Sequence, residues 1–271
     1  MKSMKEIQID VLMAIHNKEN EKYFDQCMLS LLHQTYNNFR IIMILDGPIR
    51  SELVNIIEKY KQIGLNINTY QTKLNYGLAY AMNIGLDLCK SNYIARMDSD
   101  DIAMESRFEE QLSYLLHHND IDVVGSWIED IDEGGRSLKV TKYPESHEDC
   151  YRMFRKRNPL AHPSAMFRKR YFDKAGKYKE SIKIDQDSIL WMEGFRAGAK
   201  FANIQKVLLK FRITHAALER RKHSSNIYLR NRIRIIRNLR FGFFSYIYAL
   251  LMVILYNLPL RYKVLIYKKF R

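Results

Sequence analysis

The 271-residue chain has 47% hydrophobic residues, 27% charged residues, and only 11 Gly and 5 Pro. This composition is typical of a globular protein and excludes an intrinsically disordered one. Its three cysteines are odd in number and form no Cys-x-x-Cys pair, so they indicate neither a disulfide framework nor a zinc site, and a reducing cytosol is the simplest interpretation.

The net charge of +14 is concentrated at the C-terminus. Residues 206–271 hold 16 Lys and Arg against one acidic residue, whereas residues 1–205 hold 28 basic and 29 acidic residues. A near-neutral body with a basic tail predicts that the body carries out chemistry while the tail meets a polyanionic surface. The first apolar run, Val11–Ile15, is too short and too closely preceded by charged residues to be a secretory signal.

Strand and helix patterns alternate through the first hundred residues. We expect strands over 7–15, 39–45, 65–70 and 93–97, and helices over 21–33, 53–60 and 78–85. Four strand-helix alternations imply a parallel α/β sheet. No Gly-x-Gly-x-x-Gly follows the first strand and no Walker motif occurs, which disfavours a classical dinucleotide site or a P-loop ATPase.

Polar residues follow each of these four strands. They are His16 and Asn17, then Asp46, then the loop from Lys73 to Asn75, and finally the run from Asp98 to Asp101. Because ligands of open α/β sheets bind at the carboxyl ends of the strands, these residues are expected to form one row along an edge of the sheet.

The last member of this row is the densest acidic cluster of the chain. Three carboxylates within four residues repel one another unless a cation lies among them. In an extended segment Asp98 and Asp100 point the same way and can bind one hard divalent ion, while Asp101 is left to hold a turn. The alternative is an Asp-rich loop that caps the helix expected from Glu105 to His117. In that helix Arg107 either reaches back to the cluster or to bound phosphate, or is a surface cation.

The second half of the chain begins with an expected strand over 121–128, a turn at Gly134-Gly135 and a partner strand over 137–143. His162 lies between apolar neighbours, and a lone histidine is more often structural than catalytic. Asp187, in the run Asp185-Gln186-Asp187, is expected in the first turn of a helix that contains Trp191. A helix cap is a sufficient interpretation, but a carboxylate near a sugar acceptor can also act as a general base.

The basic tail has a pattern of its own. Residues 228–240 form a basic amphipathic segment, residues 241–260 carry no charge, and residues 261–271 are basic again. The length of the uncharged run permits a transmembrane helix. The bases on both flanks, several Tyr residues, Asn257 and Pro259 favour a helix lying at an anionic cytoplasmic surface, with a soluble core helix as a third possibility.

Taken together, the motifs resemble those of the family 2 inverting glycosyltransferases of the GT-A fold, most closely the bacterial enzymes that build O-antigen, capsule or exopolysaccharide. The resemblance covers about residues 7–215 and implies a glycosyltransferase domain over 1–215 with a helical, membrane-associating tail over 216–271. The motifs that carry it, in order, are Ala14–Asn17, Asp46-Gly47, Asn75–Ala79, Asp98–Asp101, His162–Ser164, Asp187 with Trp191, and Phe211–Ile213.

The resemblance also implies a role for each motif residue. Asp46 matches the aspartate that contacts uracil, and His16 falls where the family usually has Tyr beside the base. Asp98 and Asp100 match the motif that binds Mn²⁺ or Mg²⁺ and the diphosphate, with Asp100 as the direct ligand. Asp187 matches the catalytic base, with Asp185 as second choice. The remaining expected contacts are Ala14, Asn17, Lys73, Asn75, Gly77 and Asp98 for the UDP-sugar, and His162 and Arg212 on the acceptor and diphosphate side.

The implied reaction is a single displacement, in which Asp187 takes a proton from an acceptor hydroxyl that attacks the anomeric carbon of a UDP-sugar. An α-linked donor then gives a β-linked product. The implied acceptor is a sugar on undecaprenyl diphosphate, and the implied location is the cytoplasmic face of the bacterial inner membrane, peripheral or with a single span. The alternatives are a basic nucleic-acid-binding protein that uses the tail, and a catalytically inactive UDP-binding scaffold of the same fold.

Overall fold

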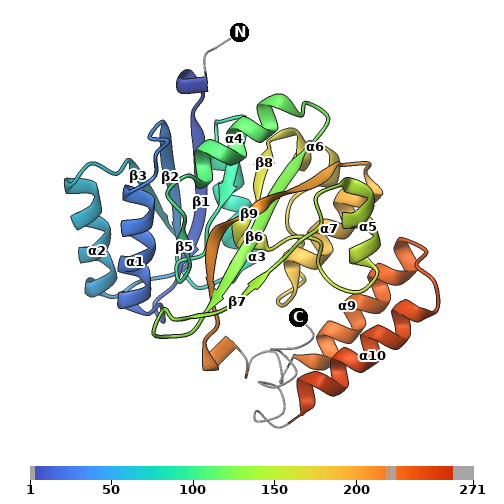
Figure 1. Ribbon diagram of the computed structural model, residues 1–271. Coiled ribbons are helices and arrows are strands. Elements are labelled where there is room, and N and C mark those ends of the chain that lie inside the picture. The colour runs from blue at the N-terminus through green and yellow to red at the C-terminus, as the bar shows by residue number, and fades with distance from the viewer. Residues whose placement is uncertain (1–3, 218, 220–223, 259–271) are drawn as a thin grey trace.

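The structure is a computed structural model that describes residues 4–217, 219 and 224–258. Within these residues nine strands form one sheet, flanked by helices (Figure 1). The strands are β1 Ile9–Ile15, β2 Phe39–Leu45, β3 Ile67–Gln71, β4 Tyr93–Arg96, β5 Ile102–Ala103, β6 Val123–Ile131, β7 Ser137–Thr141, β8 Met166–Arg168 and β9 Phe201–Arg212. The α-helices are α1 Glu21–Leu32, α2 Ser51–Gln62, α3 Leu78–Leu88, α4 Arg107–His117, α5 His147–Phe154, α6 Arg170–Ala175, α7 Gln186–Arg196, α9 Ser225–Asn238 and α10 Phe244–Asn257.

The strand order is β3-β2-β1-β4-β8-β6-β9-β5, with β7 paired to β6. The first four strands are parallel, as the alternating sequence pattern predicts. Beyond β4 the sheet becomes mixed, because β8 runs antiparallel to both β4 and β6, while β9 runs parallel to β6. The carboxyl ends of β1 to β4 therefore meet at a single edge, and the segments that follow them form the floor of the site.

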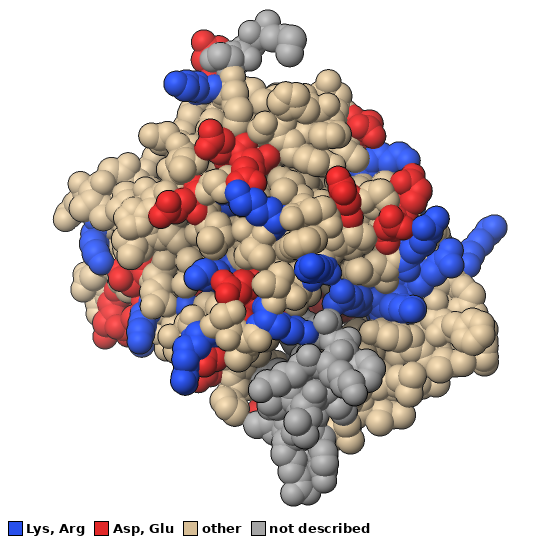
Figure 2. Space-filling view, viewed as in Figure 1, with Lys and Arg blue, Asp and Glu red and all other residues tan. Residues whose placement is uncertain are grey.

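The C-terminal helices pack together, and α9 also packs against α7 (Figure 1). Ile235, Ile236 and Ala249 share a core cluster with Trp191 of α7, so the boundary expected at residue 215 separates segments that share one core. Figure 2 shows an uncharged surface over α10, bordered by Lys and Arg side chains. In the described part of the chain, no helix is both long and apolar enough to cross a bilayer. The basic run expected over 261–271 lies outside the described residues.

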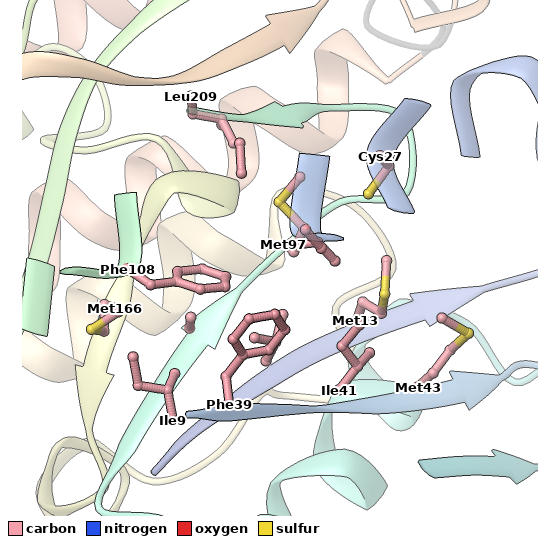
Figure 3. Close-up of a cluster of buried hydrophobic side chains, with 14 of the residues drawn as sticks. Ile9, Met13, Cys27, Phe39, Ile41, Met43, Met97, Phe108, Met166 and Leu209 are labelled. Atoms are coloured by element: carbon pink, nitrogen blue, oxygen red, sulfur yellow. The ribbon is translucent and has the colours of Figure 1, made fainter. Parts of the chain in front are cut away.

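Both faces of β1 are buried, which explains its continuous apolar sequence. Ile9, Val11 and Met13 belong to the cluster packed under α1, α2 and α4, part of which Figure 3 shows, whereas Leu12 points to the other face. On that face α3 approaches closely at Gly85, where a Cβ atom would lie 2.1 Å from Cδ1 of Leu12. Each fully buried side chain of this kind stabilises the fold by about 1.5–3 kcal/mol.

The sequence pattern misses several short elements. Neither α5, α6 nor β8 was expected, since segments of 8, 6 and 3 residues are too short to show a clear periodicity. The strand β9 is continuous from Phe201 to Arg212, and its pairing with β6 shifts register near Trp127. All three cysteines are free and buried.

Candidate functional site

The loop that follows β3 is fastened to the end of β2 by Asp46. The carboxylate of Asp46, 5% exposed, accepts hydrogen bonds from the backbone amides of Tyr76 at 2.8 Å and Gly77 at 2.9 Å. Gly47 has a φ of +89°, and a Cβ atom there would lie 2.9 Å from the Asn75 nitrogen. Only glycine combines this backbone conformation with so close an approach, so the Asp46-Gly47 motif fixes one wall of the expected nucleotide site.

The other residues expected to bind the UDP-sugar lie at the same edge. Asn17 accepts a hydrogen bond from the amide of Arg50 at 2.8 Å and so joins the loop after β1 to the start of α2. Nδ1 of His16 lies 3.2 Å from Oε1 of Glu19. Ala14 is half-buried near the end of β1, Lys73 and Asn75 are exposed, and Gly77 precedes α3. The fold thus brings all of these residues to one edge of the sheet.

The acidic loop follows β4, and its carboxylates have different environments. The buried guanidinium of Arg96 donates a hydrogen bond to Oδ1 of Asp98, whose side chain is 33% exposed. Asp101 is fully buried and accepts a hydrogen bond from the Arg212 amide, so its predicted structural role is confirmed. Burial and the charges of Asp98 and Glu19 raise the pKa of Asp100 to about 7.

The raised pKa of Asp100 indicates whether the acidic loop is suited to bind a cation. A buried carboxylate beside other carboxylates is destabilised as an anion, and a divalent ion would remove that penalty. Within the described residues no group of three or more His, Cys, Asp or Glu could hold a metal ion. Asp98 and Asp100 therefore fit an ion only if a ligand, such as a diphosphate, supplies further oxygens.

Glu19 belongs to this cluster but was not expected from the sequence. Its Oε2 atom accepts a hydrogen bond of 2.8 Å from the Ser99 hydroxyl, and its charge acts on Asp100. A single glutamate in the loop after β1 has no motif around it, so only the sheet topology, which pairs β1 with β4, brings it to the acidic loop.

Two arginines lie behind the acidic loop and are not exposed in front of it. Arg212, 2% exposed, donates from Nε to the carbonyl of Asp100 at 2.9 Å and stacks over Tyr23 at 4.2 Å. It orders the loop from inside the protein. Arg107 is fully buried, and its Nη2 donates to the Arg96 carbonyl at 2.7 Å, so the expectation of a surface cation is wrong. It reaches back to the strand end that precedes the cluster.

A pocket of about 500 Å³ connects the acidic loop to the C-terminal half of the chain. Asp98 and Asp187 both line it, although 88 residues separate them in sequence. His162 and Asp185 line it as well. The wall formed by the C-terminal helices contributes Tyr228, Arg232, Tyr248, Met252, Leu255 and Tyr256. The C-terminal wall was not expected from the sequence, because nothing in the pattern of the tail links it to the aspartates.

Asp187 lies in the first turn of α7, as expected. It accepts a hydrogen bond of 2.9 Å from Nδ2 of Asn158. Burial raises its pKa and the charge of Asp98 adds to the increase, although the backbone amide of Ser188 acts in the opposite direction. A carboxylate with a raised pKa is a stronger base once ionised, so this position suits proton abstraction.

Asp185 precedes α7 in a left-handed conformation with a φ of 64°. One of its oxygens accepts from the Ser188 hydroxyl, and the other is buried without a partner among the described residues. Burial and the charge of Asp187 raise its pKa to about 7, whereas Ser188 and Arg232 lower it. The charged side chains along the pocket are therefore ordered as Asp98, Asp187, Asp185 and Arg232, each acting on the pKa of the next.

His162 is a buried, neutral part of the pocket wall. Its Nε2 atom lies 2.7 Å from the Tyr178 hydroxyl, and its ring meets that of Trp191 edge-on at 5.9 Å. Burial, followed by the charge of Arg96, lowers the pKa of His162 to about 3. His162 thus faces the pocket as an uncharged imidazole at neutral pH. Tyr178, its partner, has no sequence signal that singles it out.

Comparisons with known proteins agree with this geometry. A family model described as glycosyl transferase family 2 matches residues 10–176. The amylovoran biosynthesis glycosyltransferase AmsE of Erwinia amylovora is 31% identical over 227 residues, covering 84% of each chain. The UDP-Gal:alpha-D-GlcNAc-diphosphoundecaprenol beta-1,3-galactosyltransferase of Escherichia coli is 30% identical over 211 residues, covering 78% of this chain and 76% of the relative.

Solved structures confirm the predicted fold. The crystal structure of S. aureus TarS matches with a TM-score of 0.65 and 17% identity, covering 94% of this chain and 44% of that chain. The crystal structure of S. aureus TarS 1-349 in complex with UDP-GlcNAc matches with a TM-score of 0.62 and 16% identity, covering 94% of this chain and 82% of that chain.

Proposed function

The chain belongs to glycosyl transferase family 2, and we propose that it transfers a hexose or N-acetylhexosamine from a UDP-sugar to a hydroxyl of a lipid-linked sugar, with inversion. The product is a β linkage in a bacterial surface polysaccharide. The observation that carries this proposal is that Asp98 and Asp187 line the same pocket. It is further supported by the names of the relatives, one of which acts on a diphosphoundecaprenol-linked GlcNAc, and by the UDP-GlcNAc complex of TarS.

The donor end of the site is the edge formed by β1 to β4. Asp46 and the loop that it fastens bind the uracil ring, and His16 lies beside it. Asp98 and Asp100 would hold Mn²⁺ or Mg²⁺, and the bound ion would neutralise the diphosphate of the donor. Arg96 holds one Asp98 oxygen, and Arg212 holds the Asp100 carbonyl, so neither aspartate needs to rearrange when the donor arrives.

The proton transfer belongs to Asp187. Asn158 holds one carboxylate oxygen at 2.9 Å, and the nearby backbone amides of Asp187 and Ser188 orient the carboxylate in the pocket where the acceptor hydroxyl would lie. Asp98 shares the pocket with Asp187 and raises its pKa, which supports Asp187 over Asp185 as the group nearer the donor. The deprotonated hydroxyl attacks the anomeric carbon, and the bond from that carbon to the UDP oxygen breaks on the opposite face, which inverts the configuration.

We place the enzyme at the cytoplasmic face of the bacterial inner membrane, attached by α10. Five apolar side chains of α10 are 39–84% exposed, namely Phe244, Ile247, Leu250, Leu251 and Ile254. Exposed arginines of α9 recur at helical spacing, namely Arg230, Arg234, Arg237 and Arg240 at its end. An apolar face beside a basic stripe matches an anionic lipid surface, which accepts the apolar residues and attracts the arginines.

One experiment tests the proposed reaction. A panel of UDP-sugars is incubated with the protein, with and without Mn²⁺ or Mg²⁺, and a GlcNAc-α-diphosphate acceptor that carries an alkyl chain. We expect transfer with at least one donor, dependence on the added ion, and a β linkage in the product. UDP binding without any transfer would support the inactive scaffold, and transfer with an α linkage would contradict the inverting mechanism.

A further inference from the structure

Arg232 of α9 is a buried cation that forms no ion pair with any of the described residues. It is 1% exposed and lines the same pocket as Asp98 and Asp187. Its Nη2 donates to the Phe154 carbonyl at 2.6 Å, but its Nε and Nη1 find no partner in the described part of the chain. The Phe154 ring, 5.3 Å from Cζ, compensates part of the lost hydration, but a buried guanidinium with unused donors is still costly.

The charges around Arg232 do not compensate it within the free protein. Asp185 acts on Arg232 from a distance, but no ion pair joins the two side chains in the described structure. One buried oxygen of Asp185 has no partner at hydrogen-bond distance among the described residues, although the Asn231 side chain lies close enough to lower the pKa of Asp185. Along the pocket from Asp98, both Asp185 and Arg232 come after Asp187. Their unused hydrogen-bonding atoms therefore lie on the side of the pocket that we assign to the acceptor.

The wall next to Arg232 is aromatic and apolar. Tyr228, Tyr248 and Tyr256 line it together with Met252 and Leu255. Tyrosines supply an apolar ring with a polar tip, which suits a ligand that has both polar and apolar parts. α10 thus turns one face to the pocket through Tyr248 and Met252, and its exposed apolar face outward.

We propose that Arg232 binds a phosphate group of the acceptor, the phosphate that links the acceptor sugar to its carrier. A guanidinium supplies charge-assisted donors to phosphate oxygens, and with Nη2 held by Phe154 the remaining donor group is Nη1, which forms a single contact, while the Nε–H points to the other side. The acceptor sugar then lies between Arg232 and Asp187, with the apolar continuation of the acceptor along the tyrosine wall. This inference rests on the proposed function, because it identifies the acceptor end of the same pocket.

The test measures binding of defined probes in the absence of a UDP-sugar. The probes are octyl GlcNAc-α-diphosphate, octyl α-GlcNAc without phosphate, and the water-soluble GlcNAc 1-phosphate, each titrated by calorimetry. The variants are Arg232→Met, which keeps the length of the side chain, and Arg232→Lys, which keeps the charge. Arg152→Met is the control, since the Arg152 side chain is 71% exposed on α5 and does not line the pocket. Circular dichroism and the melting temperature establish that each variant folds.

We expect the wild-type protein and Arg152→Met to bind the diphosphate probe at least about tenfold more tightly than the phosphate-free probe. Arg232→Met loses this difference, and Arg232→Lys retains part of it. Equal losses on both octyl probes would indicate a packing role and overturn the proposal, as would unchanged affinity in Arg232→Met. If the octyl diphosphate probe binds more tightly than GlcNAc 1-phosphate, the natural ligand is a lipid-linked sugar phosphate. If the two bind equally, the natural ligand is a soluble sugar phosphate. Both outcomes support phosphate recognition by Arg232.

Because binding is measured without a donor, the two proposals can fail separately. If binding depends on the phosphate and on Arg232 but the protein transfers no sugar from any UDP-sugar, the proposed reaction is wrong and the phosphate site is supported. Sugar transfer that does not depend on Arg232 or on the phosphate of the acceptor would remove the phosphate site and leave the reaction.

Discussion

The backbone amide of Arg212 donates a hydrogen bond of 2.8 Å to Oδ1 of Asp101, which joins two residues 111 positions apart. The side chain of Arg212 adds hydrogen bonds to the Asp100 carbonyl at 2.9 Å and to the Asp132 carbonyl at 3.2 Å. The position of the acidic loop thus depends on the last residue of β9, and Arg212 acts on the proposed metal site as a positioning residue.

Arg212→Met is therefore expected to lower the free energy of unfolding by about 2–4 kcal/mol, since it removes a buried guanidinium that donates to the partly buried carbonyls of Asp100 and Asp132. Urea denaturation measures the change. Arg136→Met is the matched control, because the side chain of Arg136 is 87% exposed and pairs with the nearby Asp132, and we expect little change there. Equal stability losses in the two variants would contradict the positioning role.

Asp187→Asn tests the assignment of the base. The change keeps the size of the side chain and removes its ability to accept a proton, so we expect kcat to fall by about 10²–10⁴-fold with the KM for the UDP-sugar unchanged. Asp87→Asn, at a side chain that is 65% exposed on α3, serves as the control and should retain full activity. A larger loss in Asp185→Asn than in Asp187→Asn would move the base to Asp185.

Asp185 makes stability depend on pH. Its pKa is about 7 in the folded protein, raised by burial and Asp187 and opposed by Ser188 and Arg232, and 3.8 as the ordinary value. A raised pKa means that the folded state holds the proton more tightly, so this contribution is complete below pH 4 and is lost as the pH rises to about 7. Asp185→Asn should therefore stabilise the protein at pH 8 relative to pH 4, as measured by urea midpoints.

Asparagine is a suitable replacement at this position because it tolerates the left-handed backbone of Asp185 better than most residues. Asp87→Asn again provides the comparison and should show a stability difference that does not change with pH. A difference for Asp185→Asn that is constant between pH 4 and pH 8 would contradict the raised pKa.

The exposed face of α10 is tested by binding to vesicles that contain anionic lipids. Phe244 and Leu251 are 84% and 53% exposed, and the double change Phe244→Ser with Leu251→Ser should weaken cosedimentation by about 10–100-fold. Ile63 and Leu29, 50% and 42% exposed away from α10, provide a control pair for the same change to Ser. Equal binding of both double variants would argue against docking through α10.

The amino-acid sequence by itself determines the first half of the sheet and the acidic residues at its edge. Buried parallel strands such as β1 and β2 are apolar on both faces, and each is followed by a polar residue, so the pattern along the chain is enough to place Asp46 and Asp98 at the carboxyl edge. The helix position of Asp187 is also local, because it follows from the periodicity that begins beside it.

Only the tertiary structure determined which of these residues line the same pocket. Asp98 and Asp187 share a pocket because β8 inserts antiparallel between β4 and β6 and the chain after β8 brings α7 to the same edge, a crossover with no local sequence signal. Arg232 reads as one of several arginines in a basic amphipathic helix, and its burial with unused donors arises when α9 packs against α7. Burial depends on contacts between distant segments, and a pattern along the chain does not encode them.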